Sequence, residues 1–185
     1  MSETECDHTS VGVIARDSQN KILLIKRANY PFGFAPPSGH CDGLSYGITC
    51  IKEFEEETGL NVNRYVAPKP IGIRRPLKKF QCKRPKGDYH IWQIFEVIWQ
   101  GEIRLNDRET KSIGWYSPAE IKTMMRKTDQ HLADLKLADW AEEESWRQSI
   151  KESIEARWKE NPGLEPVWCE FFREVPELVT MLGRA

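Results

Sequence analysis

The sequence lacks any apolar run long enough to cross a bilayer. Such a helix needs about 18 consecutive apolar residues, whereas 30% of these 185 residues are charged and the mean hydropathy is −0.60. The first residues, 1–7, are acidic and polar, and they lack the basic start and apolar stretch of a signal peptide. We therefore expect no signal peptide, no membrane-spanning segment and no membrane partner.

Cysteine is scarce, odd in number and scattered, with no Cys-x-x-Cys pair. The five are Cys6, Cys41, Cys50, Cys82 and Cys169. This spacing argues against a disulfide scaffold and against a zinc site, and it favours a reducing compartment, which makes the cytoplasm the expected location. We expect Cys41 and Cys50 to act as small apolar core residues.

An excess of charge of either sign is also missing. The chain has 27 Lys and Arg against 28 Asp and Glu, for a net charge of −1. This balance argues against a globally basic nucleic-acid binder, although it still allows a local basic patch. The length and composition are typical of one globular domain with an appendage.

Two apolar runs, 11–15 and 21–25, flank turn-forming residues and predict a β-hairpin. Prolines and glycines recur over 31–43 and predict a shaped loop. A helix is predicted over 46–58, because Ile48, Ile51 and Phe54 recur every third residue and Gly59 stands where a left-handed C-cap belongs.

Further strands are predicted over 60–66, 91–99 and 113–116. A second helix is predicted over 118–127, with Ser117 as its N-cap and Glu120 completing a capping box. Strands on both sides of a central helix favour an α/β sandwich with a mixed sheet.

The last third of the chain holds four of the seven tryptophans and few β-branched residues. Trp146, Ile150, Ile154 and Trp158 recur every fourth residue, so they form the apolar stripe of a helix. We expect this stripe to be buried against the sheet domain, a second copy in a homodimer, or another partner. The predicted organisation is a polar tail over 1–8, a domain over 9–127 and a helical extension over 128–185.

The central helix carries an acidic cluster. Glu53, Glu56 and Glu57 stand at positions i, i+3 and i+4, so their carboxylates share one side of the helix. Hard oxygen ligands at this spacing suit Mg²⁺ or Mn²⁺. On charge spacing alone, a solvated acidic face is the simpler interpretation.

A longer pattern favours the metal. The stretch 39–60 resembles the Nudix box, and six of its nine fixed positions match: Gly39, Glu53, Glu56, Glu57, Gly59 and Leu60. Together with the Pro-rich approach 36–39 and the segment 115–120, the resemblance extends over about residues 9–127. It implies a Nudix-type α/β/α sandwich with a mixed sheet and a helical C-terminal extension.

The box departs from the pattern at three points. The loop after Gly39 is one residue short, and the place of the early glutamate is taken by Leu44, or by Ser45 if the gap is placed differently. Lys52 replaces the arginine, and Phe54 stands at the aliphatic position. A lysine is a point charge and does not reproduce a guanidinium fork, so the metal ligands are retained while part of their support is lost.

The resemblance implies roles for particular residues. The metal would be bound by the Gly39 carbonyl and by Glu53, Glu56 and Glu57, with Lys52 supporting them. An additional carboxylate, Glu102 or Glu109, would complete the shell or act as base. The candidates for substrate contact are Lys26, Arg27, His40, Arg74 and Arg75.

The segment 74–86 has seven basic residues in thirteen. It suits either a polyphosphate grip or RNA, and a solvated loop without a partner is an equal alternative. Trp92, Trp99 and Trp115 could stack on a base, but core packing is the simpler role for them.

These features predict a metal-dependent pyrophosphohydrolase. Its substrate would be a nucleoside diphosphate linked to another moiety, cleaved at a phosphoanhydride bond with Mg²⁺ or Mn²⁺. The alternative is a Nudix fold without turnover that senses nucleotides or binds proteins. RNA is a less favoured partner.

Overall fold

The computed structural model describes residues 5–29, 31–72, 76–77, 82, 84–105, 110–140 and 143–183. The strands are β1 (Thr9–Ala15), β2 (Ile22–Arg27), β3 (Phe34–Ala35), β4 (Ser38–His40), β5 (Asn61–Val62), β6 (Lys69–Gly72), β7 (Pro76–Leu77), β8 (His90–Val97), β9 (Trp99–Gln100) and β10 (Thr110–Tyr116). The helices are α1 (Tyr46–Thr58), α2 (Pro118–Ala138), α3 (Glu144–Glu160), α4 (Pro166–Glu174) and α5 (Pro176–Met181).

The largest sheet is mixed, as predicted. Its strands follow the order β4-β1-β8-β6, and β7 also pairs with β8. β1 and β8 run parallel, whereas β4, β6 and β7 pair antiparallel with their neighbours. A second sheet has the order β10-β2-β3, and β5 pairs with β9.

The predicted hairpin over 11–25 is wrong in its pairing. Both strands form, but β1 and β2 enter different sheets, and an isolated antiparallel bridge joins Arg16 to Ile22 between them. Val11, Val13, Ile14 and Ala15 are fully buried, as is the first part of β2. A strand buried on both faces has no polar alternation to indicate its partner, so the turn between the runs was the only signal.

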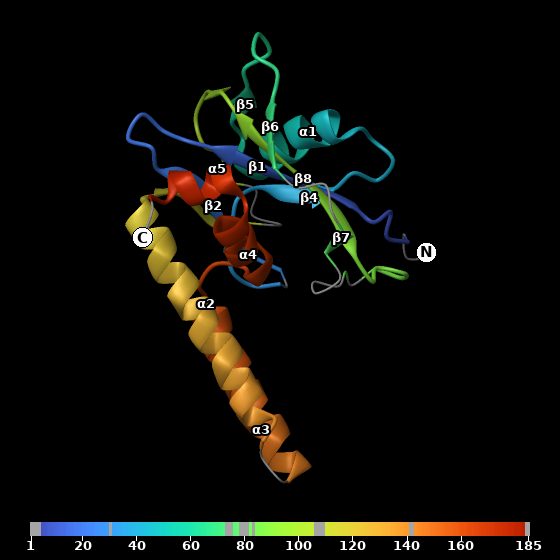
Figure 1. Ribbon diagram of the computed structural model, residues 1–185, viewed down its shortest axis with the longest axis vertical. Coiled ribbons are helices and arrows are strands. Elements are labelled where there is room, and N and C mark those ends of the chain that lie inside the picture. The colour runs from blue at the N-terminus through green and yellow to red at the C-terminus, as the bar shows by residue number, and fades with distance from the viewer. Residues whose placement is uncertain are drawn as a thin grey trace.

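Helices cover both faces of the mixed sheet (Figure 1). Val11 and Val13 of β1 pack with Phe54 of α1 in one apolar core. On the opposite face, Ile14 of β1 packs with Trp168 of α4 in a second core, to which α5 also contributes. This arrangement is the predicted α/β/α sandwich, and its second helical layer comes from the C-terminal part of the chain.

Helix α1 has the predicted bounds and the predicted C-cap. The Ser45 side chain accepts a hydrogen bond from the Ile48 amide at the N-terminus, and Gly59 adopts φ 70° at the C-terminus. The predicted apolar face is partly wrong, because Ile48 is 57% exposed while Phe54 is fully buried. Cys50, the residue one turn before Phe54, is fully buried instead. Desolvation raises the pKa of its thiol to about 12.

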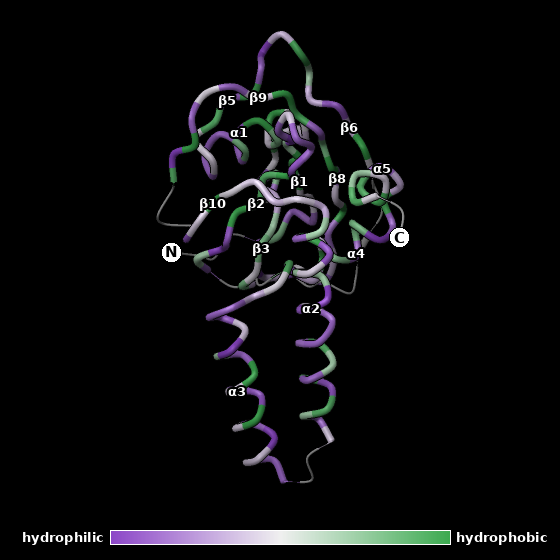
Figure 2. Tube along the Cα trace, turned by 90° about the vertical axis from the view of Figure 1, so that its left-hand side faces the viewer, coloured by the Kyte–Doolittle hydropathy of each residue, from purple (hydrophilic) through white to green (hydrophobic). Residues whose placement is uncertain are grey.

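Helix α2 has the predicted N-terminal capping box between Ser117 and Glu120. It continues past residue 127 to Ala138 and forms an antiparallel pair with α3. The pair extends away from the sheets (Figure 2). None of the described helices is long and apolar enough to cross a membrane.

Within the chain, the apolar stripe of α3 is buried at two of its four positions. Ile154 and Trp158 are buried, whereas Trp146 is 67% exposed and Ile150 is 43% exposed. Trp158 stacks on His131 of α2, and its indole N–H donates to the Phe32 carbonyl. The distal part of α3 lies beyond the domain, where α2 alone cannot cover the whole stripe.

Candidate active site

Glu57 is the most buried of the three predicted carboxylates, with 4% of the residue exposed. It lies in the last turn of α1, and its Oε2 accepts a hydrogen bond of 2.9 Å from the Ser38 amide of β4. A buried carboxylate needs such a partner, because an unsatisfied charge is costly to bury. The bond joins the C-terminal half of α1 to the strand that carries Gly39.

Glu53 lies directly against Gly39. A Cβ atom added to Gly39 would come within 2.1 Å of the Glu53 carboxylate, so this position has no space for any side chain. Only 14% of the Glu53 side chain is exposed. The glycine of the box is therefore explained by the close approach of a carboxylate to the β4 backbone.

Lys52 lies between the two more accessible carboxylates. Its Nζ is 3.4 Å from Glu53 Oε1 and 3.5 Å from Glu56 Oε2, and the Glu56 side chain is 56% exposed. Desolvation lowers the pKa of Lys52, but the charges of Glu53 and Glu56 outweigh it and hold the pKa above its usual value. A single cation thus already bridges two of the predicted ligands.

The arrangement suits a divalent cation with hard oxygen ligands. Glu53 and Glu57 both approach the short strand that contains Gly39, and Glu56 is close enough to share a cation with Glu53. Carboxylate and carbonyl oxygens are the donors that Mg²⁺ and Mn²⁺ prefer. The residues present therefore fit the metal that the sequence pattern implies.

The shortened loop between β4 and α1 forms a tight turn. Asp42 and Gly43 have φ values of 49° and 82°, and the Leu44 amide donates to the Cys41 carbonyl. Leu44 is 44% exposed. Asp42 forms an ion pair with Arg84, so the acidic residue of this loop binds an arginine from a distant segment.

Lys26 and Arg27, at the end of β2, contact the segment between α3 and α4. Lys26 Nζ donates to the Glu160 carbonyl, and Arg27 Nη1 is 4.0 Å from Glu165 Oε2. Arg27 Nε is buried without a hydrogen-bond partner among the described residues. Burial raises the pKa of Glu165, and Arg27 opposes this shift. The proposed contacts of Lys26 and Arg27 with substrate stay predictions.

The other predicted residues are Glu102, Glu109, Arg74 and Arg75. Glu102 is exposed, two residues after β9. Glu109, Arg74 and Arg75 lie outside the described residues, as does most of the basic segment 74–86. Of its seven basic residues, Arg84 and Lys86 are described, and each forms an ion pair with an acidic residue.

The tryptophans proposed as stacking platforms are partly or fully inside the protein. Trp92 is buried in the core beneath α4. Trp99 and Trp115 contact each other with ring centroids 4.9 Å apart, and the Trp99 indole donates to the Arg16 carbonyl. The simpler role for Trp92, core packing, is confirmed by its burial.

His40 follows Gly39, and its imidazole points toward Cys82 and His90. Burial lowers the pKa of His40 below its usual value. Because these residues are far apart in the chain, their meeting was not predicted. A substrate contact for His40 stays a prediction.

Comparison with known proteins agrees with this geometry. A family model described as NUDIX domain matches residues 7–140. A MutT NUDIX hydrolase from Burkholderia pseudomallei is 20% identical, with 60% of this chain and 84% of that chain covered and a TM-score of 0.50. A MutT protein from Methanosarcina mazei Go1 is 16% identical, with 85% and 99% covered and a TM-score of 0.50. No curated protein matches the chain.

The chain belongs to the NUDIX family. The two solved structures share its fold at low sequence identity. Family membership makes the protein a hydrolase of pyrophosphate bonds, in a family that acts on nucleoside diphosphate derivatives and generally uses divalent metal ions.

Proposed function

We propose that the protein is a pyrophosphohydrolase that uses Mg²⁺ or Mn²⁺ to cleave a nucleoside diphosphate linked to another moiety. The observation that carries the proposal is the convergence of Glu53 and Glu57 on β4, the strand that contains Gly39. When bound, the divalent ion neutralises the pyrophosphate and lowers the pKa of a water molecule. Glu53, Glu56 and Glu57 would hold the ion, together with the Gly39 carbonyl.

The other residues position these ligands and the substrate. The Ser38 amide fixes the Glu57 carboxylate, and the cation of Lys52 limits the repulsion between Glu53 and Glu56. Lys26, Arg27, Arg74 and Arg75 are proposed to contact the phosphates, and His40 is proposed to contact the substrate. Glu102 and Glu109 remain the two proposals for the general base.

The direct test is a screen of nucleotides, nucleotide sugars and dinucleoside polyphosphates with and without Mg²⁺. On the best substrate, Glu56→Gln and Glu57→Gln should each lower kcat by at least about 10²-fold, because the charge that holds the metal is lost. Glu55→Gln is the matched control, since Glu55 lies on the same helix but pairs with Arg64. Full activity in both glutamine variants would contradict the assignment of the carboxylates.

The alternative is a nucleotide-binding or protein-binding module without turnover. The position of Lys52 favours it, because an ammonium between Glu53 and Glu56 competes with a metal for the same oxygens. Such a module would bind nucleotides without releasing phosphate or a nucleoside monophosphate. In the hydrolase, the combined change Leu44→Glu and Lys52→Arg should leave kcat unchanged or raise it.

Homodimerisation and RNA binding are the remaining partner proposals. The exposed Trp146 and Ile150 of α3 support a homodimer, which sedimentation would detect. RNA is less favoured, because Arg84 and Lys86 already pair with acidic residues, and its binding would weaken steeply with salt. The five free cysteines support a reducing compartment such as the cytoplasm.

A further inference from the structure

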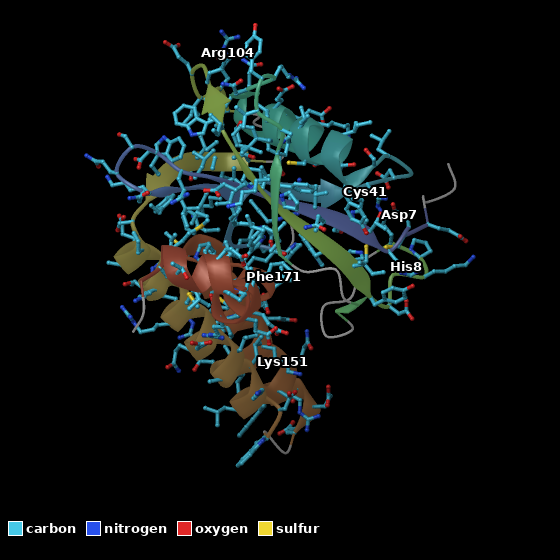
Figure 3. The ribbon with its side chains drawn as sticks, turned by 45° about the horizontal axis from the view of Figure 1, so that its top comes forward. Asp7, His8, Cys41, Arg104, Lys151 and Phe171 are labelled. Carbon is cyan, nitrogen blue, oxygen red and sulfur yellow. The ribbon has the colours of Figure 1, made fainter. Side chains whose placement is uncertain are left out.

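Two cysteines and two histidines that are far apart in the sequence meet at one end of the mixed sheet. They are Cys6, His40, Cys82 and His90, and their ligand atoms all lie within 4.8 Å of one another. The sheet brings them together, because β1 runs parallel to β8 and antiparallel to β4. The start of β1, the end of β4 and the start of β8 therefore lie side by side. Figure 3 labels Asp7 and His8, which follow Cys6 at this end.

Four distances in the group are close to the edges of a tetrahedron around a metal ion. Cys6 Sγ is 3.1 Å from His90 Nε2 and 3.7 Å from His40 Nε2, and Cys82 Sγ is 3.3 Å from His40 Nε2. The two Nε2 atoms are 3.2 Å apart. With zinc bonds of about 2.0–2.1 Å to nitrogen and about 2.3 Å to sulfur, a tetrahedral site has edges of about 3.3–3.8 Å.

Hydrogen bonds alone do not account for this convergence. His40 Nε2 has three close neighbours in the group, namely His90 Nε2 and the sulfurs of Cys6 and Cys82. An imidazole nitrogen either donates one proton or offers one lone pair, so it can satisfy one of these neighbours well. A central cation would bind all four atoms at once.

The surroundings of the sulfurs also suit a metal site. The His8 amide donates to Cys6 Sγ at 3.4 Å, and the Arg84 amide donates to Cys82 Sγ at 3.3 Å. Each donor lies two residues after its cysteine, in a tight turn, and such N–H groups stabilise thiolate ligands. His90 Nδ1 is 3.4 Å from the Ser10 hydroxyl, which can fix the orientation of that ring.

The turn that carries Cys82 is shaped to hold its sulfur. The Cys82 amide donates to the Gly87 carbonyl, and the Gly87 amide donates to the Arg84 carbonyl. A Cβ atom on Gly87 would come within 2.3 Å of the Cys82 Cβ, so the turn requires glycine there. A further backbone bond, from the Cys6 amide to the Pro85 carbonyl, joins this turn to the segment before β1.

We propose that Cys6, His40, Cys82 and His90 bind a structural Zn²⁺ ion. Two thiolates and two imidazoles are ligands that zinc prefers, and four protein ligands leave no open position for catalysis. This donor set differs from the all-oxygen set on α1, so the two sites would select different metals. The scattered cysteines, with no Cys-x-x-Cys pair, argued against a zinc site, but here the ligands come from four separate segments.

The zinc ion would stabilise the position of the Nudix box without being part of the carboxylate site on α1. His40 directly follows Gly39, so a bound ion would connect the strand beside Glu53 and Glu57 to the segment before β1 and to the turn over 82–87. It would thereby compensate for the early glutamate and the arginine that the box lacks. The proposal concerns zinc content and stability, and it holds whether or not the proposed hydrolysis is correct.

The test begins with the metal content of the full chain, purified without a chelator and without a histidine tag. Mass spectrometry of the metals should find about one zinc per chain. Cys82→Ser should lower zinc to less than about a tenth of that value, whereas Cys169→Ser, which changes a buried cysteine outside the group, should retain it. Zinc removal should also lower the melting temperature of the parent and leave that of Cys82→Ser unchanged.

Cobalt substitution provides a readout that does not depend on the variants. Co²⁺ added to the metal-free parent should give the visible bands of a tetrahedral ion and the near-ultraviolet band of thiolate ligation, and Zn²⁺ should displace it. The proposal is refuted if the parent chain contains no zinc and binds neither ion. It is also refuted if Cys82→Ser binds zinc as the parent does, or if the bound metal is iron.

Discussion

Replacement of Trp168 by alanine tests whether α4 is an integral part of the domain core. Trp168 is fully buried and contacts Trp92 of β8 and Phe171 of α4, with ring centroids 6.1 and 5.3 Å apart. An aromatic side chain of this kind buries about 150–250 Å², which at about 25 cal/mol/Å² corresponds to about 4–6 kcal/mol. Measured aromatic-to-alanine changes in cores cost about 3–5 kcal/mol. We therefore expect Trp168→Ala to lower the free energy of unfolding by about 4 kcal/mol.

Two further variants serve as comparisons for Trp168→Ala. Trp168→Phe should cost only about 1–2 kcal/mol, because it keeps a ring and removes a buried indole N–H that has no hydrogen-bond partner among the described residues. Trp146→Ala, on the exposed distal part of α3, should change stability by less than about 0.5 kcal/mol.

Equilibrium unfolding in urea, with a constant m-value across the variants, measures all three changes. The reasoning is refuted if Trp168→Ala costs less than 1 kcal/mol. It is also refuted if Trp146→Ala costs as much as Trp168→Ala, since both tryptophans would then be equally buried in solution.

Two glycine substitutions give further tests. Gly39→Ala should lower kcat at least about 10-fold, or about 1.4 kcal/mol in the barrier, because the new methyl group displaces the Glu53 carboxylate. Gly47→Ala is its control in steady-state kinetics and should leave kcat unchanged, since nothing lies within 4 Å of the new Cβ. Gly12→Ala should cost about 1–3 kcal/mol in thermal unfolding, because its Cβ would come within 2.4 Å of the Trp168 ring. A stability equal to that of the parent would contradict the close contact between β1 and α4.

The elements with local signals could be predicted from the sequence. Helix α1 has the predicted bounds, because Ser45 and Gly59 determine its ends through hydrogen bonding and a left-handed conformation. The capping box at Ser117 likewise identified the start of α2. The end of α2 was missed, because Ala138 is followed by no glycine or proline that would mark a stop.

Strand pairing could not be predicted, because it depends on contacts between distant segments. β1 and β2 are both largely apolar, and nothing in their local sequence indicates that β1 pairs with β8 while β2 pairs with β10 in another sheet. How much of the α3 stripe the chain itself covers could not be predicted for a related reason. Periodicity identifies which residues share a helix face, but whether Trp146 is covered depends on how far the helix extends past its neighbours.

The acidic cluster could be recognised from its pattern, but the environment of each carboxylate could not. Glu57 is buried, whereas Glu56 is exposed. The partner of the buried carboxylate is the Ser38 amide, which belongs to a strand and not to α1. The Cys and His group had no local signal at all, because its members come from four segments. The group could have been found by asking which Cys and His residues lie near the ends of strands that are predicted to be adjacent.

The backbone hydrogen bonds between β3 and the segment before α4 have a consequence for the synthesis of the protein. The Phe34 amide donates to the Gly163 carbonyl and the Glu165 amide donates to the Phe34 carbonyl, while the Trp158 indole reaches back across 126 residues to Phe32. A ribosome makes the strands first, at about 5–20 residues per second. Until α4 emerges, Ile14, Trp92 and Ile94 on one face of the mixed sheet have no covering layer. The nascent chain therefore exposes apolar surface for the seconds before its final helices leave the ribosome. A chaperone would bind the chain during this interval.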